Sequence, residues 1–249
     1  MIQALAPRLA RPARLARAAF AAALAAAVLL LAPAARAQGM EFSAYQKNMA
    51  FNNKVERKLA ADIIARKPDF VMLQEVNRDN GKILAMLSAE YPSQQFCTFK
   101  EIGGTAVLSR WPLVPGTDHC EDVGDFAALQ VRTPEGPVWA ISVHLETIDK
   151  PFHAIQAADL ARSLATFQGP IVIGGDFNDF PGSSAVRGLE KAAGVRRIGA
   201  AIGTRPMAGG LLAVPIDFVF ASGGQGSVER LPFLGSDHYG VLARFRFGN

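Results

Sequence analysis

The chain has 249 residues and a formal net charge of +4, but its basic residues are unevenly distributed. Residues 1–37 contain five arginines and no acidic residue, and removing them from the total of 26 leaves 21 basic residues against 22 acidic ones. The charge of the remainder therefore gives no support for bulk electrostatic binding to nucleic acid, although a local basic patch would suffice for that. No repeat, low-complexity tract or Pro/Ser linker divides it, and 212 residues are enough for one domain with a substantial core.

Residues 1–37 have the pattern of a secretory signal peptide. Arginines at positions 8, 11, 14 and 17 precede an Ala/Leu run over residues 18–32, and Ala35-Arg36-Ala37 matches a signal-peptidase site. The run is shorter than the roughly 20 residues that span a bilayer, and no later segment is long and apolar enough to do so. We predict cleavage near Ala37, export to the periplasm or beyond, and one domain over residues 38–249. A retained N-terminal anchor is the alternative.

The expected elements alternate short β-rich runs with amphipathic segments. A helix over residues 55–66 ends before Pro68, and a strand follows over 70–75. Further helices are expected at 83–87, 152–167 and 184–192, and further strands at 96–99, 105–109, 127–131, 138–145, 171–173, 216–221 and 239–247. Because helices separate only some of the strands, the pattern favours an α/β sandwich of mixed sheets over a purely parallel doubly wound sheet.

Cys97 and Cys120 are the only cysteines, and they flank one hairpin-like stretch. In an oxidising compartment such a pair predicts a disulfide, while two free buried thiols are the alternative.

Polar residues stand at the ends of apolar strands, where α/β sheets commonly assemble sites. A carboxylate in such a strand is costly unless a cation or hydrogen bonds offset its lost hydration. Each residue alone has a simpler explanation: Asp176-Phe177-Asn178 is compatible with an Asx turn, and Asp217 with a salt bridge to Arg205. The complete set indicates one site, and its members are Asn48, Glu75, His144, Asp176, Asn178, Asp217, Asp237 and His238.

The composition of this set predicts its chemistry. Oxygen ligands without cysteine favour Mg²⁺, Mn²⁺ or Ca²⁺ over structural zinc. Glu75, assisted by Asn48, is the candidate to hold the ion against a phosphoryl oxygen. His238 is a candidate general base or stabiliser of phosphate charge.

Other polar residues receive weaker assignments. Arg110 follows a strand and is a candidate phosphate ligand, although a plain surface arginine is the simpler interpretation. His153 is expected to face solvent, and His119 to serve a loop. The apolar, glycine-rich stretch over residues 207–212 is interpreted either as a loop that contacts substrate or membrane, or as a packed turn.

In order along the chain, several blocks resemble the endonuclease/exonuclease/phosphatase superfamily, which includes deoxyribonuclease I, bacterial sphingomyelinases and inositol-polyphosphate 5-phosphatases. The most specific in combination are Leu-Gln-Glu at 73–75, Gly-Asp-Phe-Asn at 175–178 and Ser-Asp-His at 236–238. The resemblance runs from Asn48 to the C-terminus. It implies a four-layer α/β sandwich, in which two mixed β-sheets lie face to face between outer helices.

The resemblance also implies roles for the site residues. Glu75, Asn48 and Asp237 match metal-binding positions, and Asp176 and Asn178 match the pair that orients water and contacts phosphate. His238 matches the catalytic histidine, and Asp217 the acid that buttresses it. His144 matches a histidine of deoxyribonuclease-, sphingomyelinase- and 5-phosphatase-like members, where apurinic-site nucleases carry tyrosine. Ala50 replaces an acidic residue found in some members, which argues against a second metal there.

These features predict a metal-dependent phosphoesterase that hydrolyses phosphodiester or phosphomonoester bonds. An exported nuclease is favoured, and a sphingomyelinase- or inositol-phosphatase-like enzyme is the alternative. A non-catalytic binding protein on the same fold is less favoured because the matched residues are complete. A serine hydrolase lacks support because no Gly-x-Ser-x-Gly motif is present. The expected partner is a phosphate-ester substrate, either nucleic acid or a lipid head group, and we expect a monomer without a stable protein partner.

Overall fold

A computed structural model describes residues 39–248 apart from 101–102, 122–124 and 147–149. The predicted signal peptide lies outside the described residues. None of the described helices is long and apolar enough to cross a membrane.

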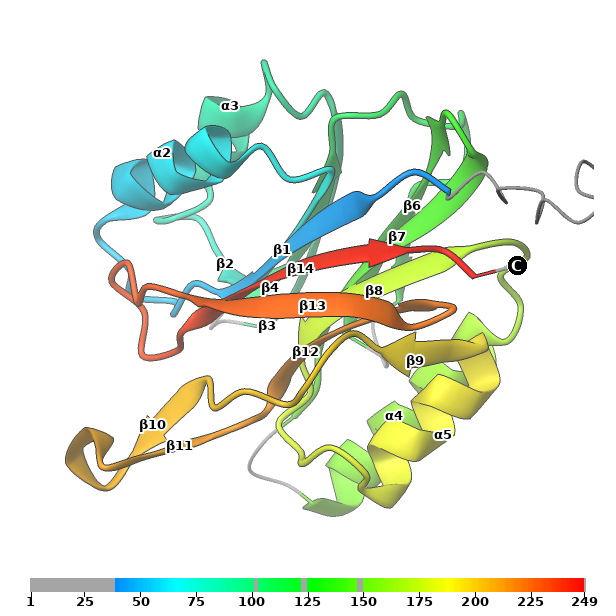
Figure 1. The fold of residues 1–249 in the computed structure, drawn as a ribbon. Helices are drawn as coiled ribbons and strands as arrows, with labels where there is room; N and C mark the ends of the chain where they lie inside the picture. The colour runs from blue at the N-terminus through cyan, green and yellow to red at the C-terminus, as the bar shows by residue number, and fades with distance from the viewer. Residues whose placement is uncertain (1–38, 101–102, 122–124, 147–149, 249) are drawn as a thin grey trace, which may run out of the picture. The chain divides into compact units, whose positions relative to one another are not determined.

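Two six-stranded mixed sheets form the body of the domain (Figure 1). The first sheet has the order β13-β14-β1-β2-β4-β3, and its strands are β1 (Phe42–Asn48), β2 (Phe70–Val76), β3 (Ser93–Lys100), β4 (Gly103–Ser109), β13 (Gln225–Leu231) and β14 (Gly240–Arg246). The second has the order β5-β6-β7-β8-β12-β9, and its strands are β5 (His119–Glu121), β6 (Phe126–Thr133), β7 (Gly136–His144), β8 (Ile171–Asp176), β9 (Val195–Arg197) and β12 (Asp217–Ser222).

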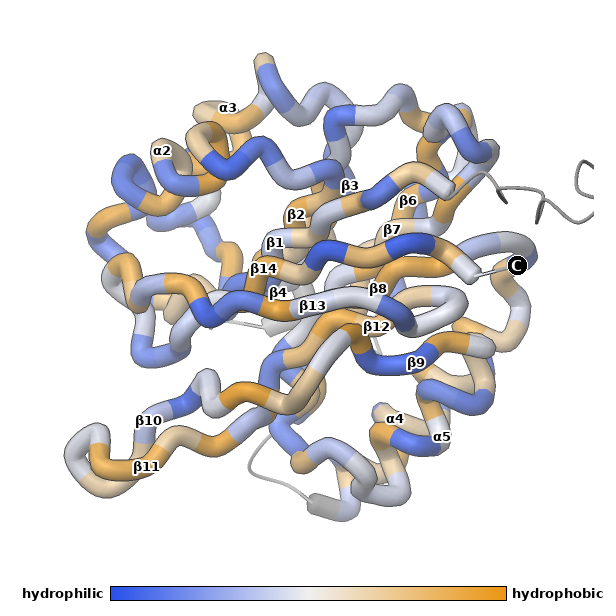
Figure 2. Tube along the Cα trace, in the orientation of Figure 1, coloured by the Kyte–Doolittle hydropathy of each residue, from blue (hydrophilic) through white to orange (hydrophobic). Residues whose placement is uncertain are grey.

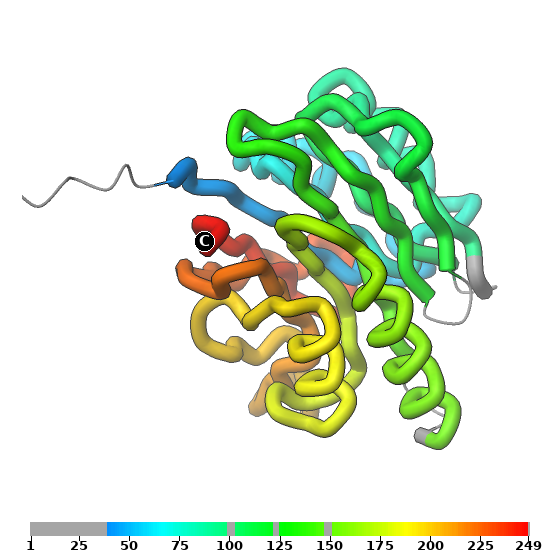
Figure 3. Tube along the Cα trace, turned by 90° about the vertical axis from the view of Figure 1, so that its right-hand side faces the viewer, coloured from blue at the N-terminus to red at the C-terminus, as the bar shows by residue number. Residues whose placement is uncertain are grey.

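Helices cover the outer face of each sheet, which confirms the predicted four layers. The helices α2 (Glu56–Arg66) and α3 (Lys82–Leu87) cover the first sheet, and α4 (Lys150–Leu164) and α5 (Ser184–Ala193) cover the second. Figure 3 shows the two pairs of helices on opposite sides of the sheets. Alternation along β2 explains how one strand serves two cores: Phe70 and Met72 pack between the sheets, whereas Val71 and Leu73 pack beneath α2 and α3.

A small hairpin departs from the second sheet. It consists of β10 (Arg205–Met207), the short helix η1 (Ala208–Gly210) and β11 (Leu212–Val214). It projects from the body at the lower left of Figure 1, and Figure 2 shows hydrophobic residues around β11. Met207, Leu211 and Leu212, which we call the hairpin tip, are 51, 86 and 68% exposed. The interpretation of this stretch as a packed turn is therefore wrong.

The disulfide between Cys97 and Cys120 confirms the predicted pairing. Cys97 lies on β3 and Cys120 on β5, which are edge strands of different sheets. The bond therefore links the two sheets along one side of the sandwich.

Candidate functional site

The topology brings the predicted polar residues to one edge of the sandwich. Asn48 and Glu75 lie at the ends of the parallel neighbours β1 and β2, and His144 and Asp176 end the parallel pair β7 and β8. Asp217 begins β12, which runs antiparallel to β8, so it pairs directly with Asp176. The carboxyl ends of parallel strands meet at the same sheet edge, and here the edges of both sheets coincide.

Asn48 joins the two halves of the site. Its fully buried amide nitrogen donates to Glu75 Oε1 and to Asp176 Oδ2, in each case over 2.9 Å. The backbone N–H of Ala50 donates to Asn48 Oδ1 and fixes the orientation of the amide. Asn48 therefore holds one carboxylate of each sheet in a defined relative position.

Glu75 lies in a local distortion of β2. Its φ of 57° is in the left-handed region, and the register with β4 shifts between Gln74 and Val76. A non-glycine residue in this conformation is strained, and a bulge redirects a side chain relative to the ladder. Glu75 Oε2 accepts a 2.7 Å hydrogen bond from the backbone N–H of Phe51. The distortion thus presents the carboxylate beside Asn48 at the rim of the site.

His238 lies between two buried carboxylates. Its Nδ1 donates to Asp217 Oδ2 over 2.9 Å, and its Nε2 lies 3.6 Å from Asp176 Oδ2. Asp217 also accepts a 3.0 Å hydrogen bond from Gln46 Nε2 at its other oxygen. The bond to Asp217 fixes the orientation of the imidazole and leaves Nε2 directed toward Asp176.

The charges shift the pKa values of both groups. Burial alone would lower the pKa of His238, but the negative charge and hydrogen bond of Asp217, with Asp176 nearby, outweigh it and raise the pKa to about 9. Burial and the charge of Asp217 raise the pKa of Asp176, against the opposing influence of His238 and His144. His238 is therefore protonated at neutral pH, and Asp176 is a stronger base than an exposed aspartate.

His144 and Asn178 complete the surroundings of Asp176. His144 Nε2 lies 3.9 Å from Asp176 Oδ2, and the backbone N–H of Asn178 donates to Asp176 Oδ1 over 3.1 Å. The latter bond is the Asx turn suggested by the sequence, and the structure also places Asp176 and Asn178 beside the other predicted site residues. Asn178 Nδ2 donates to the carbonyl of Leu145.

Asp237 and Arg110 are not brought into this cluster. Asp237 is more than half exposed and pairs with Arg205, whereas the proposed pairing of Arg205 with Asp217 is wrong. Arg110 follows β4, which is antiparallel to β2, and lies 3.4 Å from Asp69 at the opposite end of β2 from Glu75. Six residues of strand correspond to about 20 Å, so this position does not support contact between Arg110 and a phosphate at the cluster.

The two remaining histidines lie outside the cluster. His153 was expected to face solvent, but it is 4% exposed and its Nε2 donates to the carbonyl of Phe177. His119 lies on the short strand β5 instead of in a loop, and its side chain is 45% exposed.

The sequence did not indicate a chain of buried amides beneath the site. Gln46 Nε2 bridges Asp217 and Gln74, and Gln74 Nε2 donates to Ser142 Oγ over 3.0 Å. These hydrogen bonds therefore run from Asp217 on the second sheet to Gln46 and Gln74 on the first, and then back to Ser142 on the second, through an otherwise apolar core. The sequence feature that could have indicated these hydrogen bonds is a glutamine in each of two strands, Gln46 and Gln74, whose other face is hydrophobic.

Other buried groups fix the backbone around the site. The hydroxyl of Thr204 accepts the backbone N–H of Asp217, and Ser236 Oγ donates to the carbonyl of Asn48. Lys47 is fully buried and donates to the carbonyl of His238 over 2.5 Å. Burial lowers the pKa of Lys47 to about 8.

The side chains present fit a divalent cation. Asp176 and Asp217 each offer a carboxylate oxygen within 4.8 Å of the other, and Glu75 adds a carboxylate at the rim. Among the described residues, no lysine or arginine forms an ion pair with any of these three acids. One imidazolium does not balance three carboxylates, and oxygen-rich sets of this kind suit Mg²⁺, Mn²⁺ or Ca²⁺.

Solved structures share this arrangement of strands and helices. Truncated TDP2 from Caenorhabditis elegans is 17% identical with a TM-score of 0.64, over 84% of this chain and 99% of the other. A mutant beta toxin from Staphylococcus aureus with bound magnesium ions is 16% identical with a TM-score of 0.59, over 84% and 100%. An endonuclease/exonuclease/phosphatase from Beutenbergia cavernae is 20% identical with a TM-score of 0.62, over 84% and 72%.

Comparisons of the sequence itself give the family. A search of curated protein sequences found no match. A model of the Endonuclease/Exonuclease/phosphatase family matches residues 46–238, an interval that runs from the buried Gln46 to the imidazole of His238. With the four-layer fold and the clustered strand-end residues, this match shows that the chain belongs to the Endonuclease/Exonuclease/phosphatase family.

Proposed function

We propose that this chain is an exported, divalent-metal-dependent phosphodiesterase. The observation that carries the proposal is the position of His238, which is charged and directed at Asp176 across from the Glu75–Asn48 pair. Export is supported by the N-terminal sequence and by the Cys97–Cys120 disulfide, since such bonds persist in oxidising compartments.

The reaction is the hydrolysis of a P–O ester bond by water. The water oxygen forms a new bond to phosphorus, the bond to one ester oxygen breaks, and the departing oxygen takes up the proton that water loses. Asp176 is placed to orient the water and accept its proton, because its pKa is raised and Asn178 fixes its other oxygen.

Protonated His238 stabilises charge on the phosphoryl oxygens, since its Nε2 is free of any stronger partner than the 3.6 Å contact with Asp176. Asp217 keeps the imidazole charged and correctly oriented. His144 is the candidate for a second contact to phosphate. A divalent cation held by Glu75, with Asn48 beside it, would neutralise charge that develops in the transition state.

The test is hydrolysis of bis-p-nitrophenyl phosphate by the protein from Gln38 onward, with Mg²⁺, Mn²⁺, Ca²⁺ or a chelator. We expect metal-dependent turnover that Glu75→Ala and His238→Ala abolish while the far-UV circular dichroism is unchanged. Full activity in either folded variant would contradict the mechanism. Lack of turnover of this and every other diester would favour a binding protein on the same fold.

A basic cleft is the observation that favours the nuclease branch. A cavity of about 870 Å³ lies between α5 and β9 and includes Arg187, Lys191, Arg196 and Arg197 in its lining. One acidic residue, Glu190, also lines the cavity and accepts the backbone N–H of Arg197, while Arg197 Nε is buried without a hydrogen-bond partner. A nucleic-acid backbone is one polyanion that such a cleft would accept. Supercoiled plasmid DNA and RNA therefore belong in the substrate panel.

A further inference from the structure

The cleft between α5 and β9 begins beside the candidate site and extends away from it. Figure 1 shows β9 beside α5 at the lower right. Pro181 and Gly182 line the cleft just before α5, three and four residues after Asn178, and Gly194 and Val195 line it just after α5. The lining therefore extends along the whole helix, whose 10 residues correspond to about 15 Å.

Four cations line this cleft against one carboxylate. Arg187 and Lys191 are four residues apart on α5, so their side chains share one face of the helix. Arg196 and Arg197 come from β9. The carboxylate is that of Glu190, which accepts the backbone N–H of Arg197 over 3.1 Å. Four positive charges less one negative charge give the lining a formal charge of +3.

Arg197 lies on the side of the cleft nearer the site. It also lines a smaller cavity together with Asp217, and its guanidinium lies 6.0 Å from the centroid of the Phe218 ring. Its Nε is buried without a hydrogen-bond partner, which is costly for a charged donor. A guanidinium held in this way presents its remaining donors in a planar fork that suits phosphate oxygens.

The strand register gives the separation between the cleft and the site. Arg197 pairs with Phe220, which is three residues from Asp217 along β12. Val195 pairs with Ser222, which is five residues from Asp217. At about 3.3 Å per residue, the cleft covers distances of about 10 to 17 Å from Asp217 along the strand. A helical nucleic-acid strand advances about 3.4 Å per nucleotide, so this range corresponds to about three to five nucleotides.

We propose that the cleft between α5 and β9 is a second phosphate-binding site, which holds the backbone of a polynucleotide about three to five nucleotides from the phosphodiester that the candidate site hydrolyses. This inference rests on the phosphodiesterase function proposed above and names its substrate class. A nucleoside monophosphate or a phosphocholine head group in the site carries no second phosphate at that distance, whereas a polynucleotide does. The spread of four cations along a helix and a strand also matches several phosphates better than one.

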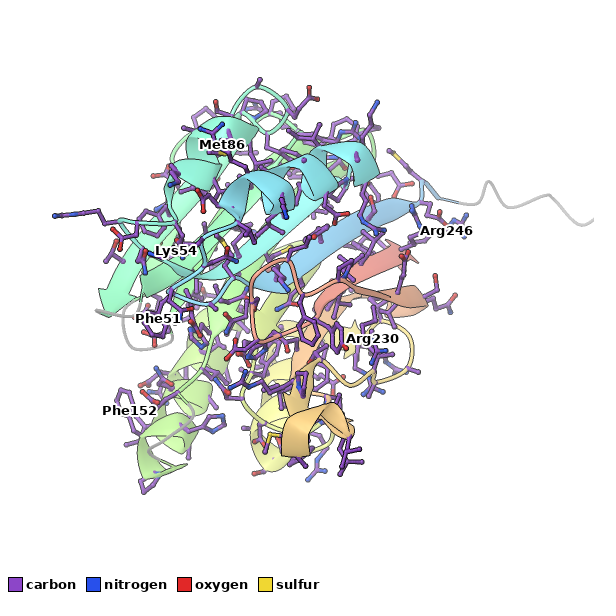
Figure 4. The ribbon with its side chains drawn as sticks, turned by 90° about the vertical axis from the view of Figure 1, so that its left-hand side faces the viewer. Phe51, Lys54, Met86, Phe152, Arg230 and Arg246 are labelled. Atoms are coloured by element: carbon purple, nitrogen blue, oxygen red, sulfur yellow. A yellow bond between two sulfur atoms is a disulfide. The ribbon has the colours of Figure 1, made fainter. Side chains whose placement is uncertain are left out.

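The first experiment measures binding without hydrolysis. A fluorescently labelled oligothymidylate of about 12 nucleotides is titrated with protein in the presence of chelator, and its anisotropy is followed at several salt concentrations. The test variant is Lys191→Ala/Arg196→Ala, since both side chains are exposed. The matched control is Arg57→Ala/Lys58→Ala, which removes one exposed arginine and one exposed lysine from α2. Figure 4 shows α2 (cyan) in the upper half of the molecule and α5 (yellow) in the lower half.

The expected change follows from counterion release. Each phosphate contact with a single strand contributes about 0.7 to the slope of log affinity against log salt concentration. Loss of two contacts should lower that slope by about 1.4, which corresponds to about 25-fold weaker binding at 0.1 M salt when 1 M salt is the reference. The control should keep the wild-type slope and affinity. An unchanged slope in the test variant overturns the inference.

The second experiment measures kcat/KM with Mg²⁺ for oligothymidylates and oligouridylates of about 2 to 12 nucleotides. We expect the wild-type value to rise with length, through a falling KM, until a strand of about six nucleotides occupies both sites. The test variant should lose this rise and the control should keep it. Either sugar supports the inference, and the better series identifies DNA or RNA. A wild-type value that is independent of length, or an equal rise in the test variant, overturns it.

Two other outcomes separate this inference from the proposed function. Failure of the wild type to hydrolyse bis-p-nitrophenyl phosphate contradicts the phosphodiesterase function, and the anisotropy experiment still tests the cleft because it requires no hydrolysis. If phosphatidylglycerol vesicles bind in a way that the test variant loses, while the oligonucleotides do not bind, the inference is overturned and the phosphodiesterase function stands.

Discussion

Asp217→Asn tests how the protein keeps His238 charged. The substitution keeps the shape of the side chain but removes the negative charge that accepts the 2.9 Å hydrogen bond from His238 Nδ1. Burial would then lower the pKa of His238 with only Asp176 and Asp237 opposing it. We expect that pKa to fall from about 9 to its ordinary value of 6.5 or below.

The size of the effect follows from these pKa values. At pH 7.5 a histidine with a pKa of about 9 is nearly fully protonated, whereas one with a pKa of 6.5 is protonated to about a tenth. Loss of protonation alone therefore lowers kcat at least about tenfold at pH 7.5. Loss of the correct tautomer adds to this, and the comparable substitution in a serine-protease triad costs about 10⁴.

The assay is the pH dependence of kcat with bis-p-nitrophenyl phosphate at saturating Mg²⁺. The limb of the profile that falls toward high pH should move from about 9 to below 7 in Asp217→Asn. Asp62→Asn is the control, because Asp62 accepts hydrogen bonds from Arg66 and Tyr45 outside the cluster. A wild-type profile in Asp217→Asn would refute this account of His238.

The same shift has a consequence for stability. The pKa of His238 in the fold lies above the value of 6.5 in the unfolded chain. The charged form therefore stabilises the fold fully below pH 6.5, and this contribution is lost as the pH rises through about 9. With chelator present, the difference in Tm between wild type and His238→Gln should narrow across that window. A constant difference would contradict the assigned pKa.

Three further predictions concern the metal, the disulfide and the buried amides. Asn48→Ala should weaken Mg²⁺ binding about 10–100-fold by calorimetry, because Asn48 orients Glu75, and unchanged affinity would argue against this pair as the metal site. Cys97→Ser/Cys120→Ser should lower the free energy of unfolding in urea by about 3 kcal/mol for a sequence separation of 23. No change would show that the disulfide does not stabilise the fold by restricting the unfolded chain. Gln74→Met should lower the free energy of unfolding by about 1–3 kcal/mol in the same urea experiment, because Gln46 and Ser142 each lose a buried hydrogen bond. An unchanged free energy of unfolding would show that the buried amides do not stabilise the fold.

The sequence predicted the layers, and it predicted most of the residues that the structure brings together at the strand ends, because both depend on local patterns. Apolar strands that end in Glu75, His144 or Asp176 need only parallel pairing to bring these residues to one edge. The strands that escaped prediction lack that pattern. β13 is an exposed polar edge strand, and β1 ends in the buried polar residues Gln46, Lys47 and Asn48.

Residues whose roles depend on tertiary pairing were not predictable in this way. Arg110 lies at the wrong end of the sheet only because β4 is antiparallel to β2, and the sequence of β4 does not reveal that direction. His153 is buried because the carbonyl of Phe177, 24 residues away, meets its helix. The Gln46–Gln74–Ser142 chain depends on how two sheets face each other, and that relation is specified by no single segment.

Two adjacent glycines precede Asp176, and they differ in what they leave room for. A Cβ at Gly175 would lie 2.5 Å from the backbone carbonyl of Val143, so that position admits no side chain without moving a strand. A Cβ at Gly174 would instead meet the side chain of Met72 at 3.1 to 3.2 Å, across the gap between the sheets. A single methyl group there would require the Met72 side chain, or the spacing of the sheets, to shift by a few tenths of an ångström. Gly174 is therefore a position, two residues before Asp176 and outside the cluster, where selection or design can alter the packing between the two sheets.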